Sequence, residues 1–179
     1  MSTIFSIGQM NQLATALENG VIRFSVTSDG TTGPEWIKWF DTNGYRLDSD
    51  VRALLKSDKF KPTKGVTYPV CVLKGERYED RDRVTKTIRA DAEKQKFPEP
   101  PLELACLIRK MFTNEQVREM GLYWIIIMHE AVNLSGDLHL LDVSCYGDDR
   151  WLAPDYDNPD DEWDRKHGFA FLTEQVSST

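Results

Sequence analysis

Four side chains in the second half of the chain could together do hydrolytic chemistry. His129 and Glu130 follow a continuously apolar run, at whose end side chains can converge on a cleft, and His139 and Asp142 come shortly after. Neutral imidazoles and carboxylate oxygens are ligands that zinc and related divalent metals accept. A metal-dependent hydrolase using these four residues is therefore one candidate function.

The spacing of these residues nevertheless favours a non-catalytic protein over an enzyme. A helical zinc-protease motif would need a second histidine where Asn133 stands. His139 shares one face of an expected strand with Leu141 and Val143, as a core histidine does. The sequence also contains neither a glycine-rich phosphate loop nor a nucleophile elbow. We expect no catalytic residues and no cofactor, and a divalent metal remains the alternative.

The second chemically capable group is an acidic, aromatic stretch near the C-terminus. Eight carboxylates fall between Asp148 and Asp164 and are interleaved with aromatic residues. Tryptophan, tyrosine and charge within one loop are typical of interface anchors with electrostatic steering. The sequence therefore predicts a surface that binds a basic protein partner and is formed by Trp151, Tyr156, Asp157, Asp160, Asp161 and Trp163.

Two other interpretations of the acidic stretch remain open. Carboxylates spaced along a surface can imitate a row of phosphates, so an acidic nucleic-acid mimic is a further alternative. Residues 155–160 also alternate oxygen-bearing side chains, as a calcium loop does. That pattern fails at its sixth position, where Asp160 replaces glycine, and at its twelfth, where Lys166 replaces glutamate.

Charge is distributed unevenly along the 179 residues, whose net charge is −7. Residues 1–51 carry −3, residues 52–110 carry +6 and residues 111–179 carry −10. Such asymmetry bears on partners and on steering rather than on fold. The acidic total argues against nucleic acid as a ligand, because displacing phosphate counterions requires a basic excess. The basic middle segment could instead dock the acidic tail of the same molecule or of another copy, which makes self-association a second hypothesis.

Cysteine usage and apolar runs predict a soluble cytoplasmic protein that does not enter a membrane. Cys71, Cys106 and Cys145 are odd in number and widely spaced, which is typical of buried free thiols in a reducing compartment. The N-terminus lacks the basic start and apolar run of a signal peptide. The longest apolar run, 122–128, is far shorter than the roughly 20 residues that span a bilayer.

Hydrophobic periodicity predicts helices in the first two-thirds of the chain and strands after them. Helices are expected over 6–18, 34–44, 49–55, 82–97, 101–111 and 113–121. Strands are expected over 21–27, 66–73, 122–128, 138–146 and 169–176, with a shorter one from Trp151. Pro69 cannot donate to a ladder, which predicts that 66–73 is an edge strand or a bulged one.

This segregation of helices from strands predicts an α+β fold. A helix-rich N-terminal two-thirds would pack on a C-terminal antiparallel sheet, a meander of three or four strands. The length fits a single domain over 1–179, with a helical part containing two strands at 1–112 and a sheet at 113–179.

Several short segments resemble a family of uncharacterised bacterial proteins. They are Pro34-Glu35-Trp36-Ile37, Lys61-Pro62-Thr63 with Gly65-Val66-Thr67, Glu103-Leu104-Ala105-Cys106-Leu107-Ile108-Arg109, Met128-His129-Glu130, Arg150-Trp151-Leu152 and Gly168-Phe169-Ala170-Phe171. The similarity extends from about Pro34 to the end of the chain. The family has no assigned activity, so the resemblance implies one continuous unit and no particular chemistry.

Overall fold

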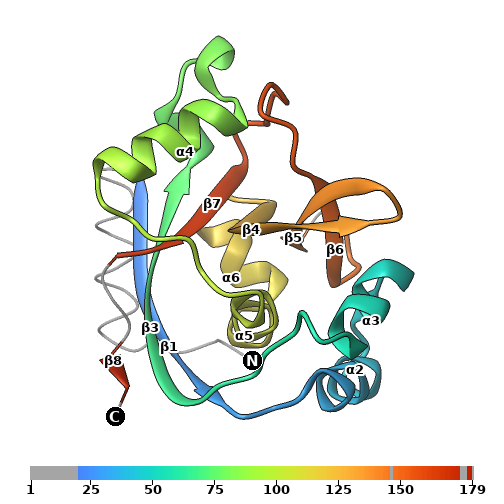
Figure 1. The fold of residues 1–179 in the computed structure, drawn as a ribbon. Coiled ribbons are helices and arrows are strands. Elements are labelled where there is room, and N and C mark those ends of the chain that lie inside the picture. The colour runs from blue at the N-terminus through green and yellow to red at the C-terminus, as the bar shows by residue number, and fades with distance from the viewer. Residues whose placement is uncertain (1–19, 146, 174–176, 179) are drawn as a thin grey trace.

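The computed structural model of the protein contains one mixed β-sheet whose strands alternate with helices along the chain (Figure 1). The structure describes residues 20–145, 147–173, 177 and 178, so the helix expected over 6–18 lies outside the described residues. Seven strands follow the order β1-β3-β7-β4-β5-β6-β2, and a short β8 pairs with β3. The strands are β1 (Val21–Asp29), β2 (Arg46–Leu47), β3 (Lys64–Lys74), β4 (Trp124–Leu134), β5 (Asp137–Ser144), β6 (Trp151–Tyr156), β7 (His167–Leu172) and β8 (Ser177–Ser178).

Helices α3 and α6 begin at residues whose side chains cap them, Asp48 and Thr113. The Thr113 hydroxyl accepts a hydrogen bond from the Gln116 amide while the Gln116 side chain accepts one from the Thr113 amide, which confirms the predicted capping box. None of the helices in the described ranges is both long and apolar enough to cross a membrane. The helices are α2 (Gly33–Thr42), α3 (Ser49–Lys56), α4 (Thr85–Lys94), α5 (Glu103–Met111) and α6 (Asn114–Glu119), with short 3-10 turns η1 (Gly75–Arg77) and η2 (Asp80–Asp82).

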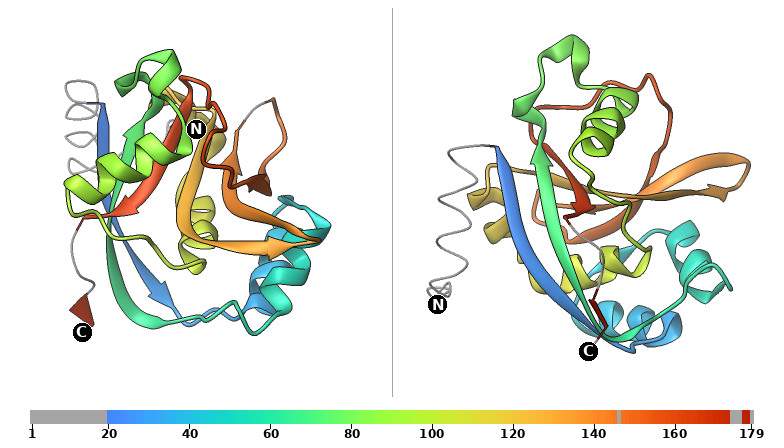
Figure 2. Two further views of the ribbon diagram at one scale, coloured as in Figure 1. Left: turned by 45° about the horizontal axis from the view of Figure 1, so that its top comes forward. Right: turned by 60° about the vertical axis from the view of Figure 1, so that its left-hand side comes forward.

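The sheet separates two hydrophobic cores, because successive side chains of a strand point to opposite faces. In β4, Ile125 and Ile127 join the larger core with α2, α3, α5 and α6, whereas Ile126 and Met128 join the smaller core. The smaller core contains Ile88 and Ala92 of α4, which lies beside β3 and β7 (Figures 1 and 2). We call the side covered by α4 the α4 face.

The predicted arrangement of a helical part packed on a C-terminal antiparallel meander is wrong. Strands β4, β5 and β6 do form antiparallel neighbours, but β7 does not continue that series. It runs between β3 and β4, antiparallel to the first and parallel to the second. Phe169, Ala170 and Phe171 are buried, and a strand covered on both faces suits the middle of a sheet. The early and late strands therefore form one sheet, while the extent of the domain stays a prediction.

Strand β3 is an interior strand, so of the two predicted alternatives the edge position is wrong, whereas its ladder with β1 does contain an irregularity, between Thr27 and Asp29. Pro69 pairs with Ser25 of β1, and its carbonyl accepts a hydrogen bond of 2.8 Å from the Thr173 amide on the other side. The carbonyl and the nitrogen of one strand residue point to the same side. The missing N–H of Pro69 thus faces the end of β7, where the regular β3–β7 ladder begins only at Val70. The proline costs β3 no hydrogen bond to β1.

Candidate functional site

The acidic stretch forms a loop that is bound to the helix α4 of the same molecule. We define the acidic loop as residues 157–166, which connect β6 to β7. Asp157 pairs with Arg89 at 3.2 Å and Asp160 pairs with Lys86. The Lys86 amide also donates to the Pro159 carbonyl at 3.0 Å, at the start of α4. Docking of the basic segment onto the acidic tail, as anticipated from the charge pattern, thus occurs within one molecule.

Trp163 is the apolar anchor of this loop and not a surface residue. Its side chain is 8% exposed and packs in the smaller core, 5.8 Å from the Phe169 ring. The indole N–H donates to the Thr85 hydroxyl at 3.0 Å, so the polar edge of the ring is satisfied as well. In the folded molecule this tryptophan holds the loop against α4 and cannot serve as an exposed contact.

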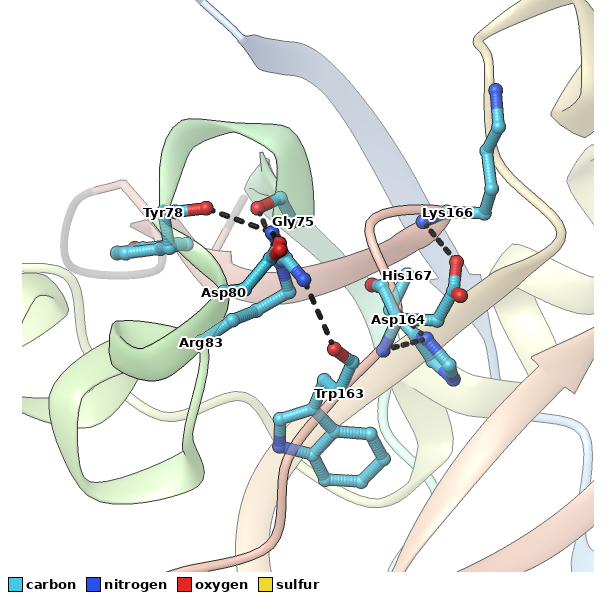
Figure 3. A network of polar contacts seen from close by, with 8 residues as sticks. All are labelled: Gly75, Tyr78, Asp80, Arg83, Trp163, Asp164, Lys166 and His167. Atoms are coloured by element: carbon cyan, nitrogen blue, oxygen red, sulfur yellow. Dashed lines mark hydrogen bonds and ion pairs between the residues drawn. The ribbon is translucent and has the colours of Figure 1, made fainter.

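Arg83 ties the acidic loop to the two 3-10 turns. Its guanidinium donates to the carbonyls of Gly75 at 2.8 Å, Tyr78 at 2.9 Å and Trp163 at 3.3 Å, and it pairs with Asp80 at 2.8 Å (Figure 3). The planar fork of arginine can serve several acceptors at once, which a lysine cannot. The arginine side chain is almost wholly buried while Asp80 is exposed, so the charge is compensated mainly by backbone carbonyls.

The approach of the loop to the 3-10 turn η1 also depends on glycine. A side-chain carbon at Gly75 would lie 2.8 Å from the Asp164 carbonyl oxygen and 3.0 Å from that of His167. Real side chains avoid such contacts with backbone atoms, so only glycine allows these two segments to meet.

Tyr156 is the candidate residue that remains available to a partner. It is 58% exposed, and with Leu138 it is one of two exposed large apolar residues in the described chain. Its ring lies 4.7 Å from that of His139, which supports it from beneath. The Asp155 carboxylate accepts a hydrogen bond of 2.9 Å from the Tyr156 amide, although the two side chains, as neighbours on β6, point to opposite faces of the sheet. Burial, followed by the charge of Asp161, raises the pKa of Asp155 above its usual value. We call Asp155, Tyr156 and Asp161 the Tyr156 site.

Trp151 lies at the other end of β6 and is only half-buried. The guanidinium of Arg46, its register partner on β2, lies 5.6 Å from the centre of its ring. This contact is a cation–π pair that secures the short parallel β2–β6 ladder. Trp151 therefore supports the sheet edge and is separated from Tyr156 by the length of β6.

His129 is engaged through both ring nitrogens. The Leu141 amide donates to Nε2 at 3.0 Å, so Nδ1 carries the proton and donates to the Glu130 carbonyl at 2.7 Å. Burial lowers the pKa of His129 to about 4. Metal ligation needs a free nitrogen lone pair, and here the only lone pair is used by the backbone of β5.

The remaining hydrolase candidates do not converge with His129. His139 and Asp142 lie three residues apart on β5, so they point to opposite faces of the sheet. Asp142 is buried with Oδ1 unpaired, and desolvation followed by the charge of Asp155 raises the pKa of Asp142 well above its usual value. Glu130 is exposed. Within the described ranges, no three histidine, cysteine or acidic residues form a group that could hold a metal ion.

The three cysteines are free and buried. Burial raises the pKa of Cys71 to about 11 and also raises the pKa values of Cys106 and Cys145. A thiol is nucleophilic only as the thiolate, so these residues are inert packing groups.

Sequence reasoning missed a groove of about 730 Å³ that lies beside β4. Its lining combines Asp58, Lys59 and Lys61 of the segment after α3 with prolines before α5 and the outer part of β4, where Glu130 lies. These segments are far apart in sequence and meet only in the fold. The one local signal in the sequence was a phenylalanine between two lysines. In the structure Phe60 is buried, and Lys59 and Lys61 on either side of it are exposed.

Comparison of the chain with models of protein families, with curated proteins and with solved structures finds no match.

Proposed function

We propose that the chain is a non-catalytic interaction protein that binds a basic protein partner through the Tyr156 site. The observation that carries the proposal is the exposure of Tyr156, at 58%, on the His139 ring that supports it. Tyrosine gives a large contact area and a polar tip at low entropic cost, and it is enriched among residues that dominate binding energy. The flanking carboxylates would steer a basic partner toward it.

Three of the other acidic and aromatic candidates hold this site in place. Asp157 and Asp160 are paired with α4, and Trp163 is buried. A loop fixed at these points loses little conformational entropy when a partner binds beside it. The proposed contact surface is therefore smaller than the whole acidic stretch, and it is preorganised.

Neither alternative function gains a supporting observation. A hydrolase would need His129, His139 and Asp142 to meet, yet two of them face opposite sides of β5. A nucleic-acid mimic would need a free row of carboxylates, yet Asp157 and Asp160 are paired with basic residues of the same chain.

A cytoplasmic location is part of the proposal. Three buried free thiols suit a reducing compartment, because none of them could form a disulfide without rearrangement of the core. The observation that bears on location is that the described residues contain no helix suited to span a membrane.

Site-specific photo-cross-linking tests the proposal. A photoreactive phenylalanine analogue replaces Tyr156 in one protein and the half-buried Tyr123 in a control protein. Cross-linking in the cells that encode the chain should give a discrete product with a basic protein at position 156 and none at position 123. The same products at both positions, or none at 156, would contradict the proposal.

A further inference from the structure

The outer edge of β6 is open beyond Leu152. Strand β2 pairs with β6 only at Trp151 and Leu152, so residues 153–156 have no strand partner on that side among the described residues. After β2 the chain enters α3, whose buried side chains join the larger core and do not extend the ladder. The open edge thus ends at Tyr156, the exposed residue of the Tyr156 site.

The register between β5 and β6 determines which backbone groups face this edge. Tyr156 lies opposite His139, and at the next position the Asp157 amide donates to the Leu138 carbonyl at 2.9 Å. Hydrogen-bonded and non-hydrogen-bonded pairs alternate along an antiparallel ladder, so Tyr156 belongs to a non-hydrogen-bonded pair. The N–H and C=O groups of Tyr156 therefore point away from β5, and so does the C=O group of Pro154, two residues earlier.

The open edge offers hydrogen-bond acceptors but no free donor. Pro154 has no N–H, and the Tyr156 amide already donates to the Asp155 carboxylate at 2.9 Å. No residue in the described part of the chain donates to the carbonyls of Pro154 or Tyr156. Another strand would need donors as well as acceptors along the edge. This edge is therefore unsuited to strand addition and suited to a group that only donates.

The Tyr156 ring lies on the same side of β6 as these carbonyls point. His139 belongs to β5 and covers one face of the ring, with 4.7 Å between the ring centres. The opposite face is directed away from β5, and the tyrosine is 58% exposed. A planar cation that stacks on this face would lie over the open edge of β6.

We propose that the Tyr156 site binds an arginine side chain of its basic partner. The guanidinium group is planar, stacks on aromatic faces, and carries five N–H donors and no acceptor. It would stack on the exposed face of Tyr156 and donate to the carbonyls of Pro154 and Tyr156. A lysine ammonium carries the same charge but cannot stack as a plane. The inference rests on the proposed function and names the side chain by which the partner is recognised.

Titration with short peptides tests the inference without the partner. A glycine–arginine–glycine peptide with blocked ends is added to isotope-labelled protein. NMR follows the ring signals of Tyr156 and the amide signal of Asp157, whose peptide unit contains the Tyr156 carbonyl. We expect both signals to shift in a saturable manner. The affinity should fall roughly threefold or more when citrulline replaces arginine, which removes the charge, or when lysine replaces it, which removes the plane.

Stacking and hydrogen bonding are tested separately. Tyr156→Leu removes the ring and should abolish binding of the arginine peptide, whereas Tyr156→Phe keeps the ring and should preserve it. Dimethylation of the arginine keeps its charge but blocks its donors, so the dimethylarginine peptide should bind the unaltered protein more weakly.

The inference is overturned if the arginine peptide causes no shift, if Tyr156→Leu binds it unchanged, or if the citrulline, lysine or dimethylarginine peptide binds as tightly. Failure of the inference and failure of the proposed function are distinguishable. A basic protein cross-linked at position 156 without a preference for arginine would leave the proposed function intact. Arginine binding without any cross-linked partner would contradict the proposed function alone.

Discussion

At the scale of single residues, His129 shows how a chemically capable side chain becomes a structural one. Its ring fills the irregularity in the β4–β5 ladder between Ile127 and Val132 and accepts the Leu141 amide there. The amide would otherwise be a buried donor without a partner. The sequence identified His129 as a candidate ligand but could not show that the lone pair was already used, because the donor is a backbone group of another strand.

This role makes a prediction about pH. The pKa of His129 is about 4 in the folded state and about 6.5 in an unfolded chain, so the unfolded state binds the proton first. Its contribution to the free energy of unfolding is therefore constant above pH 6.5 and decreases as pH falls toward 4, by up to about 3 kcal/mol. His129→Gln retains an acceptor for Leu141 but cannot be protonated, so the variant should lack this decrease.

Urea unfolding of both proteins across this pH range measures the effect. The difference between them isolates His129, since Asp142, whose raised pKa gives the opposite trend, is present in both. A parallel decrease in the two proteins would show that His129 is not the titrating group.

At the scale of elements, helices that depend on local sequence signals were predicted well, whereas the pairing of the strands was not. The capping box at Thr113 and the break at Gly121 depend on neighbours within four residues, and the structure confirms the helix between them. The position of β7 depends on β3 and β4, which lie far away in the chain. The sequence predicted a strand over 169–176, but several arrangements of a sheet would accommodate it.

The sequence predicted which residues form the acidic, aromatic stretch, but only in part which of them are exposed at the surface. Carboxylates and aromatic residues were recognised, yet their burial depends on α4, where the Thr85 hydroxyl accepts from the Trp163 indole N–H and the Arg89 guanidinium donates to the Asp157 carboxylate. An acidic loop and a basic helix in one chain can pair with each other or with other molecules. The sequence alone does not distinguish these cases, because the distance between the two segments is set by the fold.

Arg83 gives the sharpest prediction at this scale. Arg83→Lys keeps the charge but leaves buried carbonyls of Gly75, Tyr78 and Trp163 without their donors, so the free energy of unfolding should fall by about 3 kcal/mol. Arg81→Lys is the matched control, because the Arg81 side chain is 88% exposed and should change stability by less than about 0.5 kcal/mol. Denaturant unfolding of both variants is the measurement. Equal losses in the free energy of unfolding would show that Arg83 does not hold the loop and the turns together.

At the scale of the whole molecule, the fold neutralises part of its own charge asymmetry. The basic α4 binds the acidic loop, and the Tyr156 site remains as an acidic surface. This surface depends on β5, whose His139 supports Tyr156. The fold thus leaves the Tyr156 site as a candidate contact surface.

The most direct test of the central claim is the affinity of the basic partner captured at position 156, measured by calorimetry. Tyr156→Ser should weaken binding by at least about 2 kcal/mol, as for a dominant contact residue, and Asp161→Asn should reduce the dependence on salt. Glu119→Gln, an exposed carboxylate at the end of α6, is the control and should leave the affinity unchanged. If Tyr156→Ser binds the partner as tightly as this control, Tyr156 is not the contact and the proposed function is wrong.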